Sequence, residues 1–243
     1  MFYLHENIIM KNNILLSIVI PTYWHIEYTQ EVLWYLRQNT PENTELIFID
    51  DGSTDGTVEF LSKQKDIIFV DNKINKWVTY SRNLWVSMAT WEYICVINND
   101  IVFEKWFFEK LIEWFKDHPS ILFTVPRRTN WRKGKENKLI RYYGNHLCWF
   151  CYMIKQEDKD FIFPLEPRLR IFGSDNRAYR KTKDMWLYIN TVKDAICHHY
   201  ESITSKSEYN VDTEIFFNIA KEEWWNIVDT IYIDTEPKWN ILI

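Results

Sequence analysis

The chain contains very little glycine, only 5 residues of 243, although it contains 13 tryptophans. Glycine normally makes up about 7% of a soluble protein, and the two counts together come to about that share. Several tryptophans stand where a turn or a helix end favours the left-handed backbone, which glycine adopts easily and a bulky aromatic residue does not. Trp77, Trp91 and Trp224 are examples. We therefore hypothesise that many of the tryptophans are glycine codons read under the wrong genetic code.

The sequence also lacks an excess of positive charge and a long apolar run. The net charge is −5, and Glu136 interrupts the longest basic stretch, residues 127–138, so we expect no nucleic-acid partner. No apolar run approaches the roughly 18 residues of a membrane span, and residues 14–20 are typical of a first strand. We therefore expect a soluble, cytoplasmic protein, and leave open peripheral association with the inner face of the membrane.

The four cysteines do not form a pattern typical of a disulfide framework in a chain of this size. Cys148 and Cys151 make one CxxC pair, which could bind zinc together with Cys197 and a neighbouring histidine. A single CxxC is weak evidence for zinc, whereas free cysteines are commonly buried as small hydrophobic residues. We therefore predict core thiols.

Apolar runs alternate with amphipathic stretches through the first half of the chain. Strands are predicted at 15–21, 44–50, 66–71 and 92–97, and helices at 27–39, 57–63, 81–90 and 105–117. The alternation predicts one α/β domain with a parallel sheet covered by helices on both faces. After Pro126 the pattern loosens, and the expected elements are an irregular surface segment at 127–143 and a strand at 147–154. A helix is expected within 172–183, after Gly173, Ser174 and Asp175, and a last helix at 212–221.

Two acidic clusters directly follow predicted strands. Asp50 and Asp51 open the segment DDGSTDGT after the second strand, and Asn98, Asn99 and Asp100 follow the fourth. In an open α/β sheet the carboxyl ends of the strands line the ligand crevice, so these side chains are predicted to face a ligand. Two such ends suit a nucleotide and its metal ion. An ordinary turn that caps the next helix remains the alternative for both clusters.

Four motifs, in this order and spacing, resemble the family 2 glycosyltransferases of the GT-A fold. They are SIVIPTY at 17–23, DDGSTDGT at 50–57, SRN at 81–83, and EYI at 92–94 running into NND at 98–100. The resemblance is strong over the first half and thin over the second. It implies a single GT-A domain over 1–243, with one doubly wound, mostly parallel sheet. Its nucleotide-binding half would be about 14–125 and its acceptor-side half about 126–243.

The same family usually has glycine at six positions that tryptophan occupies here. These positions are Trp77, Trp85, Trp91, Trp106, Trp149 and Trp186. The coincidence supports the recoding hypothesis independently of composition.

The resemblance also implies which residues bind the nucleotide-sugar donor, with a UDP-sugar favoured. These residues are Pro21, Thr22, Tyr23, Asp50, Asp51, Arg82 and Asn99. Asp51 would accept a hydrogen bond from the base ring, Arg82 would position the nucleotide, and Asn99 would bond a ribose hydroxyl.

A metal site is implied by the third motif and by a late histidine. Asp100 matches the last acid of the family's DxD motif, whose oxygen ligands hold Mg²⁺ or Mn²⁺ on the diphosphate, although Asn98 and Asn99 replace the other acids. His199 resembles a late histidine that approaches the metal or the diphosphate in related enzymes. His198 is an equal chemical candidate.

Asp175 occupies the place of the family's acceptor-side acid, so the resemblance makes it the general base of an inverting transfer. A helix-capping role is the alternative, and Glu166 and Asp184 are the next candidates for the base. The expected reaction moves a sugar to a hydroxyl of a glycan or lipid-linked precursor, as in the synthesis of cell-envelope polysaccharide. Two other functions stay open: an inactive nucleotide-sugar binding domain, and a sugar-1-phosphate nucleotidylyltransferase. The second normally needs a Gly-rich loop after the first strand, which is missing here.

Overall fold

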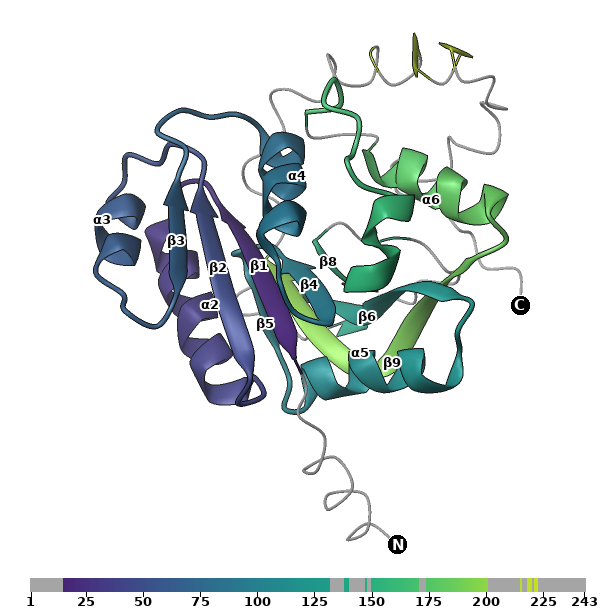
Figure 1. Cartoon of the computed structure of the whole chain (residues 1–243). Helices are drawn as coiled ribbons and strands as arrows, with labels where there is room; N and C mark the ends of the chain where they lie inside the picture. The colour runs from purple at the N-terminus through teal and green to yellow at the C-terminus, as the bar shows by residue number, and fades with distance from the viewer. Residues whose placement is uncertain are drawn as a thin grey trace, which may run out of the picture.

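A computed structural model of the chain describes residues 15–131, 138–139, 147, 150–170, 174–200, 215, 218–219 and 221–222 (Figure 1). The side chains at 117, 129–131, 138–139, 175 and 176 lie outside this description. The described strands form one nine-stranded sheet with the order β3-β2-β1-β4-β8-β6-β9-β5, and β7 pairs with β6.

The first half alternates strands and helices as the sequence predicts. Its elements are β1 (Leu16–Thr22), α2 (Ile26–Asn39), β2 (Thr44–Asp50), α3 (Thr57–Ser62), β3 (Ile68–Asp71), α4 (Val78–Met88) and β4 (Tyr93–Ile97). Each predicted boundary, including those of the helix at 105–117, lies within three residues of the observed one. The pattern succeeds here because neighbouring elements along the chain also pack together.

The second half departs further from the prediction. Its elements are β5 (Ile101–Phe103), α5 (Phe107–Asp117), β6 (Ile121–Trp131), β7 (Lys138–Leu139), β8 (Cys151–Lys155), the 3-10 helix η1 (Gln156–Phe161), α6 (Ser174–Asp184) and β9 (Tyr188–Tyr200). The helix expected at 172–183 is confirmed as α6. The irregular segment expected at 127–143 is wrong for residues 127–131, which continue β6 because they pair with β9. The helix expected at 212–221 falls mostly outside the described residues.

The sheet is mostly parallel, as expected. β3, β2, β1 and β4 run parallel to one another, and β6 runs parallel to β9. β8 is antiparallel to both of its neighbours, and β5 is antiparallel to β9.

Two apolar cores cover the two faces of this sheet. Ile18 and Ile20 of β1 pack in the core that contains α2, α3 and α5, whereas Val19 packs in the core that contains α4 and α6. Alternate residues of a strand point to opposite faces, so a run that is apolar throughout is buried on both sides. Figure 1 shows α4 in front of the sheet and α2 behind it. The doubly wound arrangement expected from the sequence is confirmed.

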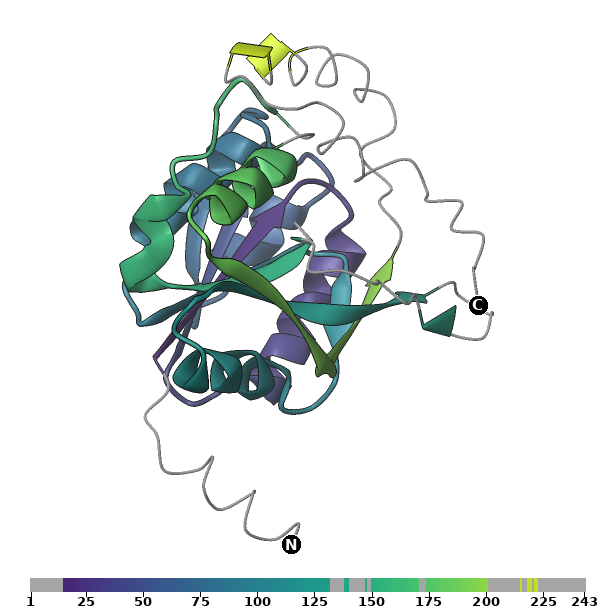
Figure 2. The same cartoon turned by 90° about the vertical axis from the view of Figure 1, so that its right-hand side faces the viewer.

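β9 bends sharply on its way across the sheet (Figure 2). Its first part pairs with β6 up to Val192, which lies opposite Pro126, and the pairing resumes with Ile196 opposite Arg127. The three intervening residues of β9 therefore have no partner in the β6 ladder and form a bulge, which bends a strand. After the bend, β9 also pairs with β5.

Four tryptophans have positive φ: Trp24 at 60°, Trp77 at 71°, Trp106 at 64° and Trp186 at 57°. The other described residues of this kind, apart from glycine, are His25 and Lys73. Only a few per cent of non-glycine residues adopt such a backbone, and large side chains adopt it least. The concentration on tryptophan agrees with the recoding hypothesis. Trp91 does not show this backbone, and Trp149 lies outside the described residues.

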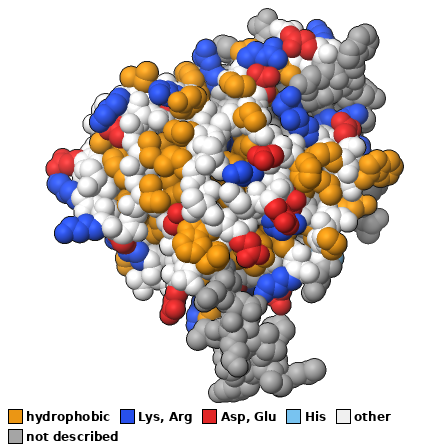
Figure 3. All heavy atoms as spheres, viewed as in Figure 1, with side chains coloured by type: hydrophobic (Ala, Val, Ile, Leu, Met, Phe, Trp, Pro, Cys, Tyr) orange, Lys and Arg blue, Asp and Glu red, His pale blue; other side chains and the backbone are white. Residues whose placement is uncertain are grey.

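Acidic and basic side chains are mixed over the face that carries α4, with exposed hydrophobic side chains between them (Figure 3). Cys95, Cys151 and Cys197 are buried thiols that are not joined in a disulfide, as predicted, whereas Cys148 lies outside the described residues. Among the residues that the structure describes, no helix has the length and apolar character needed to cross a membrane.

Candidate active site

The first acidic cluster lies where β1 and β2 end side by side. Thr22 is paired with Asp50, and the amide of Asp51 donates a hydrogen bond of 2.9 Å to the Thr22 carbonyl. Gly52 then turns the chain with φ of 88°. A Cβ added at Gly52 would lie 3.0 Å from the backbone of Ile74 and Asn75. Only glycine at position 52 therefore lets the loop that contains Ile74 and Asn75 lie this close to the turn after β2. The two loops therefore close one side of the crevice.

The Asp50 side chain stabilises this turn through hydrogen bonds. Its carboxylate is fully buried and accepts hydrogen bonds from the amides of Gly52 at 3.0 Å and Ser53 at 2.7 Å, and from the hydroxyls of Ser53 and Thr22. Burial raises the pKa of Asp50, and the bonds from Ser53, Thr22 and Gly52 oppose that rise. Asp50 and Thr22 were both predicted to contact the donor. The structure gives both side chains internal partners, and Asp50 supplies acceptors that the amides of the turn need.

Asp51 is placed differently. Its Oδ1 accepts three hydrogen bonds, from Asn72 Nδ2 at 3.0 Å, the Lys76 amide at 3.1 Å and Ser81 Oγ at 3.2 Å. These donors come from the loop after β3 and from α4, so they fix the carboxylate from one side. Since all three use Oδ1, Oδ2 keeps its acceptor capacity for a ligand.

The remaining residues predicted to bind the donor lie around this turn. Pro21 is partly buried at the end of β1, and Tyr23 is 37% exposed at the mouth of the crevice. Arg82 is buried in α4, near enough to Tyr152 for its positive charge to counter the rise that burial causes in the pKa of that phenol.

The second cluster follows β4 and is tied to α2. The Asn98 amide donates to the Phe150 carbonyl at 2.8 Å, and Asn99 Nδ2 donates to Thr29 Oγ1 at 3.0 Å. The predicted bond from Asn99 to a ribose hydroxyl can still be made by its Oδ1 or by the second N–H of Nδ2. Thr29 was not foreseen, since its place opposite the loop depends on how α2 packs.

Asp100 and His199 meet although 98 residues of chain separate them. Ile101 pairs with His199 across β5 and β9, and the Tyr200 amide donates to the Asp100 carbonyl at 2.9 Å. His199 Nε2 lies 3.1 Å from Asp100 Oδ1, and the side chains are only 6% and 15% exposed. The imidazole also stacks on Phe150 at 4.8 Å. The two predicted metal ligands are thus brought together.

His198 does not share this position. It lies opposite Val102 in the ladder, and consecutive residues of a strand point to opposite sides. Burial lowers the pKa of His198, against the charge of Glu104, which lies near it. Of the two histidines, His199 is therefore the one that faces Asp100.

The polar atoms at Asp100 and His199 fit a divalent metal ion. Within the described part of the chain, Asp100 Oδ1 and both ring nitrogens of His199 are buried, and none has a hydrogen-bond partner besides the contact of 3.1 Å between Asp100 Oδ1 and His199 Nε2. Buried polar atoms are normally paired, and a carboxylate oxygen and an imidazole nitrogen are ligands that Mn²⁺ accepts. The described residues contain no cluster of three or more protein ligands, so a metal here would need further ligands from the donor or water.

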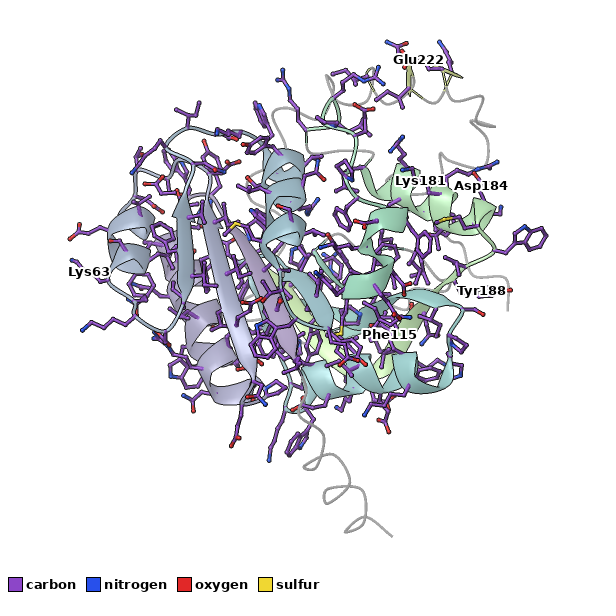
Figure 4. The ribbon with its side chains drawn as sticks, viewed as in Figure 1. Lys63, Phe115, Lys181, Asp184, Tyr188 and Glu222 are labelled. Carbon is purple, nitrogen blue, oxygen red and sulfur yellow. The ribbon has the colours of Figure 1, made fainter. Side chains whose placement is uncertain are left out.

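The acceptor side is less completely described. Asp175 is the second residue of α6, and its side chain is outside the described set. Glu166 is bonded to Arg168, which lowers the pKa of Glu166 and makes it a poorer base. Asp184 pairs with Arg180, and Figure 4 shows it at the end of α6 far from α4. Neither of these two alternatives to Asp175 is favoured by its surroundings.

The sequence matches the family described as Glycosyl transferase family 2 over residues 17–186, which is more than half of the chain. One relative is a glycosyltransferase of Streptococcus pneumoniae, 27% identical over 41% of this chain and 34% of the relative. Another is a poly-β-1,6-N-acetyl-D-glucosamine synthase of Staphylococcus epidermidis, 28% identical over 44% of this chain and 26% of the relative. The match thus spans about a third or less of these relatives.

Two solved structures share the fold at low sequence identity. GalNAc-T7 with UDP, GalNAc and Mn²⁺ is 13% identical, with a TM-score of 0.71 over 87% of this chain and 48% of the other. A mannosyltransferase from Pyrobaculum calidifontis with GDP-Man and Mn²⁺ is 14% identical, with a TM-score of 0.64 over 92% of this chain and 71% of the other. Both likenesses support the GT-A fold.

Proposed function

Because this chain belongs to glycosyl transferase family 2, we propose that it transfers a sugar from a nucleotide-diphosphate donor to a hydroxyl acceptor, with inversion at the sugar carbon. One observation carries the proposal: buried Asp100 Oδ1 and His199 Nε2 meet at 3.1 Å, and among the described residues neither atom has another hydrogen-bond partner. An ordinary turn would satisfy these atoms internally. A donor with its metal ion satisfies them instead.

The donor is a nucleotide sugar, with a UDP-sugar favoured. Asp51 Oδ2 accepts the ring N–H of uracil, while the bonds from Asn72, Lys76 and Ser81 hold the carboxylate in place. Arg82, buried in α4, supports the turn that carries Asp51. The two structural neighbours carry UDP and GDP-Man, so they are compatible with either base.

Asp100 and His199 would hold Mn²⁺ or Mg²⁺ for the donor diphosphate. The ion supplies charge neutralisation for the leaving diphosphate when it is bound. His199 contributes a neutral imidazole nitrogen, and its stack on Phe150 fixes the ring orientation. Asp100 contributes the negative charge that Asn98 and Asn99 lack.

Asp175 removes the proton from the acceptor hydroxyl as the sugar carbon is attacked from the face opposite the diphosphate. It lies in the first turn of α6, at the end of this helix nearer α4 (Figure 1). The acceptor is a glycan or a lipid-linked precursor, and the polysaccharide synthase among the relatives supports a role in the cell envelope. Such an acceptor suits a cytoplasmic enzyme that works at the inner face of the membrane.

A catalytically inactive nucleotide-sugar binding domain is the second candidate. It is favoured by Asn98 and Asn99, because Asp100 is then the one carboxylate of the segment 98–100. It is also favoured by Trp77, which has a strained backbone and lies in the loop between β3 and α4. The nucleotidylyltransferase alternative is dropped because the matched family is a glycosyltransferase family.

Asp175→Asn tests the proposal, made in a chain with glycine at the six tryptophan positions where the family usually has glycine. The amide is nearly isosteric but cannot accept the proton, so transfer from UDP-sugars should fall by about 10² to 10⁴-fold while UDP affinity stays the same. Asp184→Asn is the matched control on the same helix and should leave turnover unchanged. Turnover of Asp175→Asn within a few-fold of the parent would exclude Asp175 as the base.

A further inference from the structure

The end of β9 carries a second set of contacts that the proposed reaction does not use. Tyr200 follows His199 directly and is the last described residue of β9. Its hydroxyl donates a hydrogen bond of 3.0 Å to Glu31 Oε1, and its ring stacks on Tyr28 at 5.0 Å with an interplanar angle of 27°. Both partners belong to α2. The contacts therefore join the end of β9 to a helix on the other side of the crevice.

The end of β9 lies between two strands of unequal length. On one side β9 pairs with β6 as far as Tyr200. On the side of Asp100 its neighbour is β5, which has only three residues, and the pairing ends at Ile101 opposite His199. The Tyr200 amide adds one bond, to the Asp100 carbonyl. Few backbone bonds therefore fix this end of β9 relative to β5, and side-chain contacts on the same side help to keep His199 beside Asp100.

The position of Tyr200 lets it hold the strand without occupying the metal site. Consecutive strand residues point to opposite sides, so the Tyr200 ring packs on α2 while the His199 ring packs on Phe150. The same helix also holds the segment that contains Asp100, because Thr29 accepts a hydrogen bond from Asn99. One face of α2 thus supports both segments that carry the metal ligands.

We propose that Tyr200 is a positioning residue for the metal site, and that its bond to Glu31 and its stack on Tyr28 hold His199 beside Asp100. This inference rests on the proposed function, because it assumes that these two residues bind Mn²⁺. Tyr200 itself does not touch the ion. It raises the fraction of molecules in which the His199 nitrogen is positioned to bind the ion.

The test is calorimetric titration of Mn²⁺ into the full chain with saturating UDP, for Tyr200→Phe, Glu31→Gln and the double variant. Tyr200→Phe removes one charge-assisted hydrogen bond, so Mn²⁺ affinity should fall by about fivefold to tenfold. Glu31→Gln keeps a neutral acceptor for the Tyr200 hydroxyl, so it should lower the affinity by less. The double variant should lose no more than Tyr200→Phe, because both changes act on the same bond. UDP affinity measured in EDTA should stay within twofold of the parent.

Arg37→Gln is the matched control, because Arg37 lies on the same helix and bonds Asp66 at 2.6 and 2.7 Å away from the crevice. It should leave Mn²⁺ affinity unchanged, and His199→Ala sets the loss expected when the ligand itself is removed. If Tyr200→Phe and Glu31→Gln bind Mn²⁺ as tightly as Arg37→Gln does, the inference is overturned and the proposed function stays intact. A parent chain that binds no Mn²⁺ with UDP would overturn both.

Discussion

Trp77 and Trp186 have backbones that an aromatic residue rarely adopts. Trp77 has φ of 71° and ψ of 149°, a region that essentially only glycine occupies. Trp186 follows α6, and its amide bonds the Lys183 carbonyl while the Leu187 amide bonds the Thr182 carbonyl. This pair of bonds is the Schellman motif, in which the residue at the place of Trp186 is usually glycine. Both positions therefore support the recoding hypothesis on physical grounds.

Glycine at these positions should stabilise the protein. The left-handed backbone costs a residue with a side chain about 1 to 2 kcal/mol, so Trp186→Gly should raise the free energy of unfolding by about 1 kcal/mol. Trp186 is 85% exposed and loses little packing. Trp34, 58% exposed inside α2, is the control, because Trp34→Gly should lower the stability by about 1 kcal/mol. Urea unfolding of both variants measures the difference, and the same sign of change for both would contradict the strain argument.

The gene should contain UGA at most of the tryptophan codons, in an organism that reads UGA as glycine. Trp85 adds a further reason, because it is fully buried in α4 and its indole nitrogen has no hydrogen-bond partner among the described residues. A buried indole N–H normally finds an acceptor. Sequencing the codons decides the matter, and UGG at Trp77, Trp85 and Trp91 would exclude the hypothesis.

At the scale of the elements, β9 is the piece that the sequence could not reveal. Its first part, 188–195, shows no clear strand pattern, and its bulge shifts the register against β6. The position of His199 depends on that bulge and on pairing with β5. Local periodicity carries no information about such long-range pairing, so the site could be proposed only through the resemblance.

A clamp between α4 and the segment before α6 offers a stability test at this scale. Asn83 Nδ2 donates to the Leu165 carbonyl at 2.9 Å, and the Leu165 amide donates to Asn83 Oδ1 at 2.6 Å. Asn83→Ala leaves both backbone groups without these partners and should cost about 2 kcal/mol of stability.

Thermal unfolding together with hydrogen exchange at the Leu165 amide measures this loss. Asn83→Asp is the matched control, because it keeps an acceptor for that amide and should lose less than Asn83→Ala. Unchanged exchange at Leu165 in Asn83→Ala would show that the clamp does not hold the segment.

At the scale of the whole molecule, the first half was largely predictable and the second half was not. Asp51 and Asp100 follow strands, and Arg82 lies in a helix, that local pattern identifies, so the place of both carboxylates at one edge of a parallel sheet could be foreseen. The bonds that Asp50 and Thr22 make within the turn could not be foreseen, because the sequence does not show which donors and acceptors meet there. The second half depends on strand pairing that is non-local, which local pattern does not reveal.

The central claim is that this crevice binds a nucleotide through a metal held by Asp100 and His199. Calorimetry of UDP binding with and without Mn²⁺ tests it most directly, on the parent chain, Asp100→Ala and Asn99→Ala. Asp100→Ala removes a charged ligand, so it should abolish the Mn²⁺-dependent part of binding. Asn99→Ala removes a neutral hydrogen bond to Thr29 and should only weaken that part, by about 1 kcal/mol. Equal, metal-independent UDP affinity in the parent and in Asp100→Ala would contradict the account.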